Sequence, residues 1–390
     1  MKISFKLKCN SLLSILLIPL VYLFFFGMIS SCTKKTETIK IGLATTLTGP
    51  ASTSGIHSRN AAMLAVEQIN ASGGINGQPV ELLVRDDKGR AEVALLVDKD
   101  LIDNGVVAII GHYLSSLSVK VLPLLNDHRV LMISSGSTSS ELTGQDDFFI
   151  RLMVPDDKRA VATVDMILER WKVKKMAVIY DLSNPNYTIP FSQHFQKNFE
   201  QKGGEITASI AFNSVDKYSA SDIAGTTIDS GAEGVFLISN AINGALLSQH
   251  LRRINPEIQI TAAAWAFSEP DFIRNGGKAV EGISCLVEFD PEASDNKFQE
   301  FKTLYKQRFG DDIGINAYIA FEAAQVLFEG LQKTTEPAHL KAVILNQKAY
   351  QGLTNSIIID EYGDPSRPLY MLEIQDSRIK SVGKTEAHTG

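Results

Sequence analysis

Residues 106–143 read VVAIIGHYLSSLSVKVLPLLNDHRVLMISSGSTSSELT, and this stretch decides the fold. Two apolar runs, at residues 106–110 and 130–133, have the pattern of strands that are buried on both faces. Between them, Ser115 opens a segment with apolar residues at helical spacing, which predicts a helix. The stretch therefore predicts two neighbouring parallel strands joined by a helix.

Each of these strands runs into a turn that is rich in serine and threonine. Parallel strands end at the same edge of a sheet, and open α/β sheets bind their ligands at that edge. Hydroxyl groups and free backbone N–H groups at a helix N-terminus suit an anion. We therefore expect a ligand carboxylate to bind at these two turns.

The rest of the chain alternates strand and helix patterns, which predicts parallel sheets with right-handed crossovers. A chain of 390 residues is long enough for two domains. Residues 148–154 are expected to form a strand that crosses into a second lobe. Helices are predicted at residues 58–69 and 191–202, and Asp86-Asp87 is interpreted as a turn.

The N-terminus has the pattern of an export signal. Lys2, Lys6 and Lys8 precede an apolar run at residues 12–29. The run ends before Ser-Ser-Cys, which resembles a bacterial lipobox with Cys32 as the lipidated residue. The alternative is an uncleaved membrane anchor, because the run is nearly long enough to span a bilayer.

Composition excludes several functions. The net charge is −6 and no basic stripe is present, which argues against nucleic acid as a partner. Removal of the signal and lipidation of Cys32 would leave Cys285 alone, so no disulfide framework is expected. The sequence contains no nucleophile elbow and no metal-ligand spacing, so we expect neither an enzyme, nor a metal, nor a cofactor.

Several segments resemble the type I periplasmic binding proteins, in particular the leucine/isoleucine/valine-binding branch that serves ABC importers. They are IKIGLATTLTGPAS (39–52), AVEQINASGGINGQPVELLVRDD (65–87), GHYLSS (111–116), LMISSGSTSSELT (131–143) and FFIRLMVPDD (148–157). The resemblance implies an α/β fold of two Rossmann-like lobes, with parallel-rich sheets joined by three crossover strands. It also implies closure of the lobes about a hinge.

The expected domains follow from the crossing points. They are a lipoprotein signal peptide at 1–32, a tether at 33–38, lobe 1 at 39–155 plus 286–355, lobe 2 at 156–285 plus 356–384, and a tail at 385–390.

The resemblance also implies binding residues. The ligand carboxylate is expected at Ser115, which follows Leu114, and at Gly136 and Thr138. The remaining positions that match the family's ligand contacts are Ser54, Asp156, Tyr187, Asn240 and Trp265.

One departure from the family concerns the acid that pairs with the ligand ammonium. At that place the chain reads AAAWAF (262–267), with no acid before Glu269. Asp156 is one replacement for this charge, although it is also placed to cap the next helix. The alternatives left open are a branched-chain or other amino acid and an amine-free, for example aromatic, carboxylate.

The sequence therefore predicts a solute-binding lipoprotein of an ABC importer, which captures a small carboxylate by hinge closure. The expected partners are the ligand, the ABC permease and ATPase subunits, and the membrane that holds the N-terminal lipid. We expect a monomer in the periplasm or at the cell surface. The alternative function is a ligand-sensing subunit for a membrane signalling partner.

Overall fold

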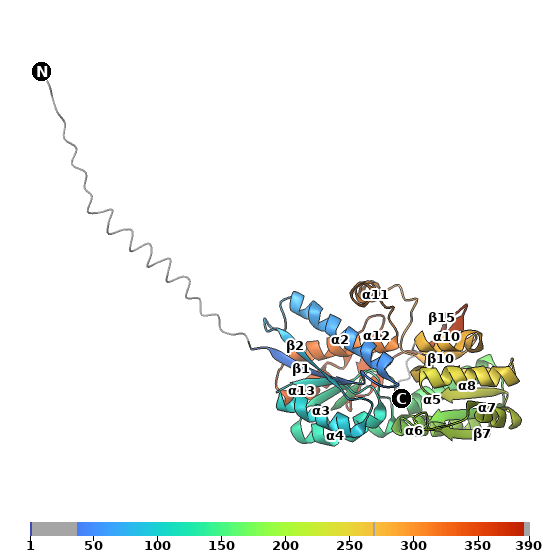
Figure 1. Ribbon diagram of the computed structural model, residues 1–390. Coiled ribbons are helices and arrows are strands. Elements are labelled where there is room, and N and C mark those ends of the chain that lie inside the picture. Colours follow the sequence, from blue (N-terminus) through green and yellow to red (C-terminus); the bar gives the residue numbers. More distant parts are fainter. Residues whose placement is uncertain (2–36, 268–269, 386–390) are drawn as a thin grey trace. The chain divides into compact units, whose positions relative to one another are not determined.

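The structure is a computed structural model that describes residues 1, 37–267 and 270–385. Residues Thr38–Gly390 form one compact unit (Figure 1). The predicted signal peptide, Cys32 and nearly all of the predicted tether and tail lie outside the described residues.

The first lobe is built on a five-stranded parallel sheet in the order β2-β1-β3-β4-β5. Its strands are β1 (Ile39–Thr45), β2 (Val80–Asp86), β3 (Ala108–Gly111), β4 (Leu131–Ser134) and β5 (Phe149–Arg151). Strands β3 and β4 are buried along their whole length, as the two apolar runs predict. The expected strand at residues 148–154 is shorter, because the chain leaves the sheet after Arg151 to cross to the second lobe.

Six helices of the described chain pack on this sheet or on the helices that cover it. They are α2 (Ser52–Ala71), α3 (Ala91–Asp103), α4 (Ser115–His128), α11 (Asn296–Phe309), α12 (Ile315–Leu331) and α13 (Pro337–Gln347). Figure 1 shows α12, in orange, beside α2, in blue, so the C-terminal part of the chain returns to the first lobe.

Helix α2 begins six residues earlier than the predicted helix at 58–69. Its first turn carries Gly55, which packs against the chain that leaves β1. A Cβ at Gly55 would lie 1.8 Å from the carbonyl oxygen of Thr46. Because this turn is made of small and polar residues, it has no apolar periodicity that would reveal it in the sequence.

The second lobe is built on a seven-stranded sheet in the order β15-β14-β10-β9-β8-β6-β7. Its strands are β6 (Lys175–Asp181), β7 (Glu205–Phe212), β8 (Gly234–Ile238), β9 (Gln259–Ala262), β10 (Ser284–Val287), β14 (Tyr370–Gln375) and β15 (Arg378–Lys384). The pairs β10–β14 and β14–β15 are antiparallel and form one edge, and the other pairs are parallel.

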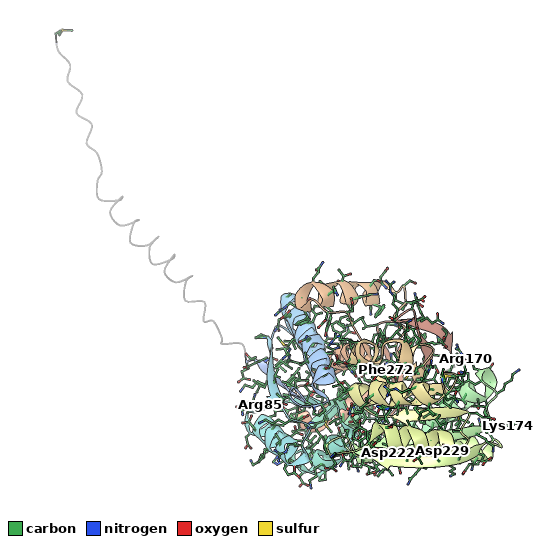
Figure 2. All side chains as sticks on the ribbon, turned by 45° about the vertical axis from the view of Figure 1, so that its right-hand side comes forward. Arg85, Arg170, Lys174, Asp222, Asp229 and Phe272 are labelled. Atoms are coloured by element: carbon green, nitrogen blue, oxygen red, sulfur yellow. The ribbon has the colours of Figure 1, made fainter. Side chains whose placement is uncertain are left out.

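The helices of the second lobe alternate with these strands. They are α5 (Asp156–Arg170), α6 (Pro185–Gln201), α7 (Ala220–Asp229), α8 (Ala241–Ile254), α9 (Ala264–Phe267) and α10 (Pro270–Gly276). Two short 3₁₀ helices, η1 (Ser140–Leu142) and η2 (Gly277–Val280), complete the described helical elements. Figure 2 shows the exposed Lys174, Asp222 and Asp229 on the outside of this lobe, whereas Phe272 is buried inside it.

A third, antiparallel sheet contains β11 (Ala349–Gln351), β12 (Ser356–Ile359) and β13 (Pro365–Ser366). The chain passes between the two large lobes after β5, after β10 and between β13 and β14. The expected domain boundaries stay a proposal. The expected second-lobe segment at 356–384 divides between this small sheet and the seven-stranded sheet.

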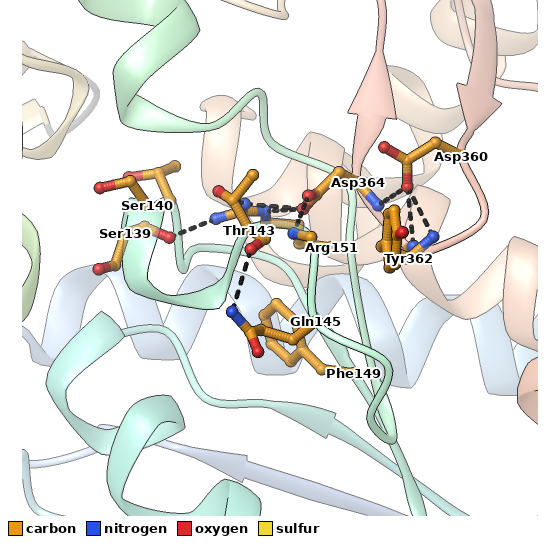
Figure 3. A network of polar contacts seen from close by, with 12 residues as sticks. Ser139, Ser140, Thr143, Gln145, Phe149, Arg151, Asp360, Tyr362 and Asp364 are labelled. Atoms are coloured by element: carbon orange, nitrogen blue, oxygen red, sulfur yellow. Dashed lines mark hydrogen bonds and ion pairs between the residues drawn. The ribbon is translucent and has the colours of Figure 1, made fainter.

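A buried arginine–carboxylate pair lies next to each crossing. The pairs are Arg151–Asp364, Arg159–Glu288 and Arg367–Glu322. Figure 3 shows the first of them. Each pair also makes a hydrogen bond to the backbone, through Arg151, Arg159 or Glu322, and so fixes the local chain around its crossing. Among these pairs, Oε2 of Glu288 has no partner within the described chain.

Candidate functional site

The backbone carbonyl of His112 organises the carboxyl edge of the first lobe. It accepts hydrogen bonds from the hydroxyl groups of Ser134 at 2.8 Å, Ser137 at 3.1 Å and Ser118 at 3.4 Å. The hydroxyl oxygen of Ser134 in turn accepts the backbone N–H of Gly136 at 3.2 Å and of Ser137 at 2.9 Å. The serine-rich turn after β4 is therefore fixed to the end of β3.

Ser115, at the start of α4, faces the same turn. Its Oγ accepts the backbone N–H groups of Thr138 at 3.2 Å and Ser139 at 3.4 Å. The hydroxyl of Thr138 is buried and has no hydrogen-bond partner within the described chain. A buried hydroxyl without a partner costs free energy, so Thr138 presents an unused donor at the place where the sequence predicts a ligand carboxylate.

Gly136 is required for the close approach of the two turns. A Cβ at this position would lie 2.3 Å from Cδ2 and 2.6 Å from the carbonyl oxygen of Tyr113. No side chain fits between the turn and Tyr113, which explains glycine here.

Thr138 lies in a cavity of about 20 Å³ between the two lobes. The described residues that line it are Tyr113, Ser115, Gly136, Thr138, Met153, Ile315 and Asn316, together with Arg159, Asn184, Tyr187, Ala264 and Trp265 from the second lobe. The rings of Tyr187 and Trp265 meet edge to face, with centroids 6.1 Å apart. Burial raises the pKa of Tyr187 well above its usual value, so its hydroxyl stays protonated.

The structure brings part of the predicted site together in this cavity. Ser115, Gly136, Thr138, Tyr187 and Trp265 line it. Tyr187 is a buried residue in the first turn of α6, a helix that begins well before the predicted 191–202. Five of the predicted binding residues therefore line one cavity, three from the first lobe and two from the second.

Ser54 and Asn240 line a neighbouring cavity of about 210 Å³, which shares Trp265 with the first. The amide of Asn240 is occupied by other contacts. Its Oδ1 caps α8 by accepting the N–H of Asn243 at 3.0 Å, and its Nδ2 donates to Asp181 at 3.3 Å. Trp265 thus lines both cavities, whereas Ser54 and Asn240 do not line the cavity at Thr138.

Leu114 and Asp156 line neither of these cavities. Asp156 is the first residue of α5, and its Oδ1 accepts the N–H of Ser140 at 3.1 Å while its own N–H donates to the carbonyl of Thr138 at 2.8 Å. Its Oδ2 is buried without a partner among the described residues. Burial raises the pKa of Asp156 to about 7, although the nearby Arg151 acts in the opposite direction.

Arg159 is a cavity residue that sequence analysis missed. Its guanidinium donates to the carbonyl of Leu286 at 2.7 Å and pairs with Glu288, whose Oε1 also accepts the N–H of Val154 at 2.6 Å. A signal was present, because Arg159 and Thr163 share the buried face of α5 at helical spacing. A charge on a buried face indicates a partner or a site.

A buried cluster of charged side chains lies next to the turns that follow β3 and β4, which we call the carboxylate turns. The ring of His112 is fully buried, with Nδ1 2.7 Å from Asp87 and Nε2 3.1 Å from Asp98. Burial alone would lower the pKa of His112, but the charges and hydrogen bonds of Asp98 and Asp87 outweigh it and raise the pKa to about 10. The interpretation of Asp87 as only a turn residue is therefore wrong. It is a buried partner of a charged imidazole.

Within the described ranges, no group of three or more His, Cys, Asp or Glu residues is placed to hold a metal ion. The same part of the chain contains no helix with the length and apolar character that a membrane crossing requires.

A family model described as "Periplasmic binding protein" matches residues 38–378. The chain belongs to the periplasmic binding protein family. Members of this family bind solutes outside the cytoplasm and are not enzymes.

The relatives of this periplasmic binding protein include a leucine-, isoleucine-, valine-, threonine- and alanine-binding protein of Pseudomonas aeruginosa. The two are 27% identical over 338 residues, which cover 84% of this chain and 87% of the relative. A leucine-binding protein from Thermotoga maritima has a TM-score of 0.83 at 22% identity, covering 89% of this chain and 99% of its own. The type I fold of two α/β lobes is thus confirmed.

A solute-binding protein of an ABC transporter from R. palustris, solved with 4-hydroxybenzoate, has a similar fold. Its TM-score is 0.81 at 18% identity, and the match covers 90% of this periplasmic binding protein and 98% of the other chain. At such identity the likeness concerns the fold alone.

Proposed function

We propose that this periplasmic binding protein is the solute-binding lipoprotein of an ABC importer and captures a small carboxylate between its two lobes. The observation that carries the proposal is the buried hydroxyl of Thr138, which has no partner in the described structure and lines the cavity beside Ser115. A carboxylate oxygen accepts a hydrogen bond from such a hydroxyl, which removes the cost of leaving it unpaired.

Capture requires the lobes to part and close again. A cavity of about 20 Å³ has room for roughly one water molecule, not for an amino acid or an aromatic acid. The first lobe presents Ser115, Gly136 and Thr138, and the second lobe covers them with Tyr187 and Trp265. Opening would expose the carboxylate site, and closure over the ligand would exclude water from it.

Proteins similar to this chain bind ligands of two classes. The P. aeruginosa relative is named for leucine, isoleucine, valine, threonine and alanine. The R. palustris structure of similar fold holds 4-hydroxybenzoate, which has no amine. Both kinds of ligand carry a carboxylate, which is the group that the Thr138 turn suits.

The proposal extends to the partners and the location. The closed form would dock on ABC permease subunits, whose ATPase partners drive release of the ligand. Lipid on Cys32, after removal of residues 1–31, would hold the protein at the outer face of a membrane.

The test uses two substitutions of similar size, of which one removes the hydroxyl of Ser115 and the other replaces the hydroxyl of Thr138 with a methyl group. The full chain in mild detergent and its Ser115→Ala/Thr138→Val variant are titrated calorimetrically with amino acids and with amine-free carboxylates. We expect at least a roughly 100-fold loss of affinity in the variant, because the carboxylate loses the hydroxyl contacts made on the first lobe.

Ser135→Ala is the matched control, because Ser135 lies buried in the same turn but does not line the cavity. Thermal melting monitored by circular dichroism checks that all variants fold. Unchanged affinity in a folded double variant would contradict the proposed site.

A further inference from the structure

The charges around the cavity discriminate between the two ligand classes. Among the described residues that line it, Arg159 is the only one that carries a permanent charge. An ammonium group enclosed there would need a carboxylate partner, since an unpaired charge is costly to bury. The described cavity wall offers it none.

The orientation of the Arg159–Glu288 pair also disfavours an ammonium group in the cavity. Arg159 lines the cavity, whereas Glu288 is fully buried and does not line it. One oxygen of Glu288 is held by Arg159 and by the backbone N–H of Val154. The positive end of the pair therefore faces the ligand, which favours an anion or a hydrogen-bond acceptor and disfavours an ammonium.

Asp156 is the other acid to consider. It does not line the cavity, and its Oδ1 already accepts the N–H of Ser140. Burial raises its pKa to about 7, so near neutral pH a large share of the molecules carry it uncharged. It is a weak counter-charge for an ammonium.

The rest of the wall suits an apolar body. The rings of Tyr113, Tyr187 and Trp265 surround the space, and Ala264 and Ile315 contribute apolar surface. Aromatic walls of this kind pack well against planar or branched hydrocarbon groups.

From these observations we propose that the ligand is a small carboxylate with an aromatic or branched apolar body and no ammonium group. The inference rests on the proposed function, because it takes the carboxylate to lie at Ser115 and Thr138. Arg159 lines the same cavity, so a hydroxyl or keto oxygen on the body of such a ligand can accept its hydrogen bond.

Matched pairs of compounds test the inference. The full chain in mild detergent is titrated calorimetrically with L-leucine against 4-methylpentanoate and with L-phenylalanine against 3-phenylpropanoate. Each pair differs only in the amine. We expect the amine-free member to bind about 100-fold more tightly, or the amino acid not to bind at all.

Tighter binding of the amino acid would overturn the inference and leave the proposed carboxylate site standing. In that case Asp156→Asn identifies the counter-charge, since it would remove amino acid binding. If no carboxylate of either kind binds, the proposed function and the inference fall together.

A variant designed to bind the amino acid in preference to the amine-free carboxylate gives a second, independent test. Ala264 lines the cavity, so Ala264→Glu places a carboxylate in its wall, and Ala264→Gln matches it in size without the charge. We expect Ala264→Glu to shift the ratio of affinities toward the amino acid by about tenfold or more relative to Ala264→Gln. An equal ratio in two folded variants would contradict the account.

Discussion

The side-chain oxygen of Asn184, in the second lobe, accepts two hydrogen bonds from Ser116, in the first. The backbone N–H of Ser116 donates at 3.1 Å and its hydroxyl at 2.9 Å. Nearby, the amide of Asn186 donates to the carboxylate of Glu141 at 3.0 Å. These contacts join the start of α6 to the start of α4 and to η1, so we expect them to break when the lobes open.

Ser116→Ala is therefore expected to weaken the closed state. The hydroxyl of Ser116 donates to Asn184 and accepts the N–H of Asn186 at 3.2 Å, and the variant loses both contacts but keeps the backbone N–H bond. This loss costs about 0.5–1.5 kcal/mol, which corresponds to roughly a two- to tenfold loss of ligand affinity. The change should lie mainly in the dissociation rate, because the bonds form after the ligand has bound to the open form. Stopped-flow displacement of a bound carboxylate measures this rate. Gln193→Ala, on the exposed face of α6, is the control, and an equal effect there would contradict the prediction.

His112→Gln tests the buried charge cluster behind the carboxylate turns. Removal of the imidazolium leaves Asp87 and Asp98 buried without their partner, at a cost of about 3–5 kcal/mol in the free energy of unfolding. Because the folded-state pKa of about 10 lies above the usual 6.5, this stabilisation is complete below pH 6.5 and is lost as the pH rises toward 10.

Chemical denaturation of the two proteins across this pH range measures the effect. The difference between parent and variant should shrink as the pH rises, whereas the exposed His128→Gln should behave like the parent. A difference that does not change with pH would mean that His112 is uncharged in the folded protein.

Burial of Asp156 also makes the stability fall as the pH rises, but over a lower pH range than for His112. Burial raises its pKa from 3.8 to about 7, so between these values the folded chain keeps a proton that the unfolded chain has released. Its contribution to stability is present below pH 3.8 and falls by about 1.4 kcal/mol per pH unit as the pH rises through this window.

Asp156→Asn removes this titration. Relative to the parent, the variant should gain melting temperature between about pH 4 and about pH 8. Asp165→Asn, on the exposed face of the same helix, should show no such gain. If the melting temperatures of the two variants change with pH in the same way, the pKa of Asp156 is not raised, which would contradict the prediction.

Arg151 connects the first crossing to the serine-rich turn (Figure 3). Its guanidinium donates to Asp364 at 2.7 Å, to the carbonyl of Ser139 at 2.7 Å and to the hydroxyl of Thr143 at 2.5 Å. A lysine ammonium cannot reach three acceptors in this planar arrangement, so Arg151→Lys is expected to cost about 2–4 kcal/mol of stability.

The partly exposed ion pair of Arg170 and Glu373 provides the comparison. Arg170→Lys should cost no more than about 1 kcal/mol. Urea denaturation of both variants measures the two costs, and similar values would show that the Arg151 network contributes little.

The parts of the site that can be predicted from the sequence are those built from residues close together in the chain. The strands β3 and β4 and the turns at Ser115 and Thr138 follow from apolar runs and adjacent hydroxyl residues, and they lie within one stretch of the chain. The resemblance to a family adds Tyr187 and Trp265, which line the same cavity.

The buried charges could not be predicted in the same way, because their partners are distant in sequence. Arg159 meets Glu288 and Arg151 meets Asp364 only after the chain has crossed between the lobes. Likewise, nothing near Asp87 in the sequence shows that it will bond to His112. Such pairs depend on tertiary packing, for which local periodicity carries no signal.

The most direct measurement is a crystal structure of the protein with a bound carboxylate. The account predicts one carboxylate oxygen within about 3 Å of the Thr138 hydroxyl, beside Ser115, with Tyr187 and Trp265 over the body of the ligand. A carboxylate bound instead against Arg159, or in the neighbouring cavity at Ser54 and Asn240, would contradict it.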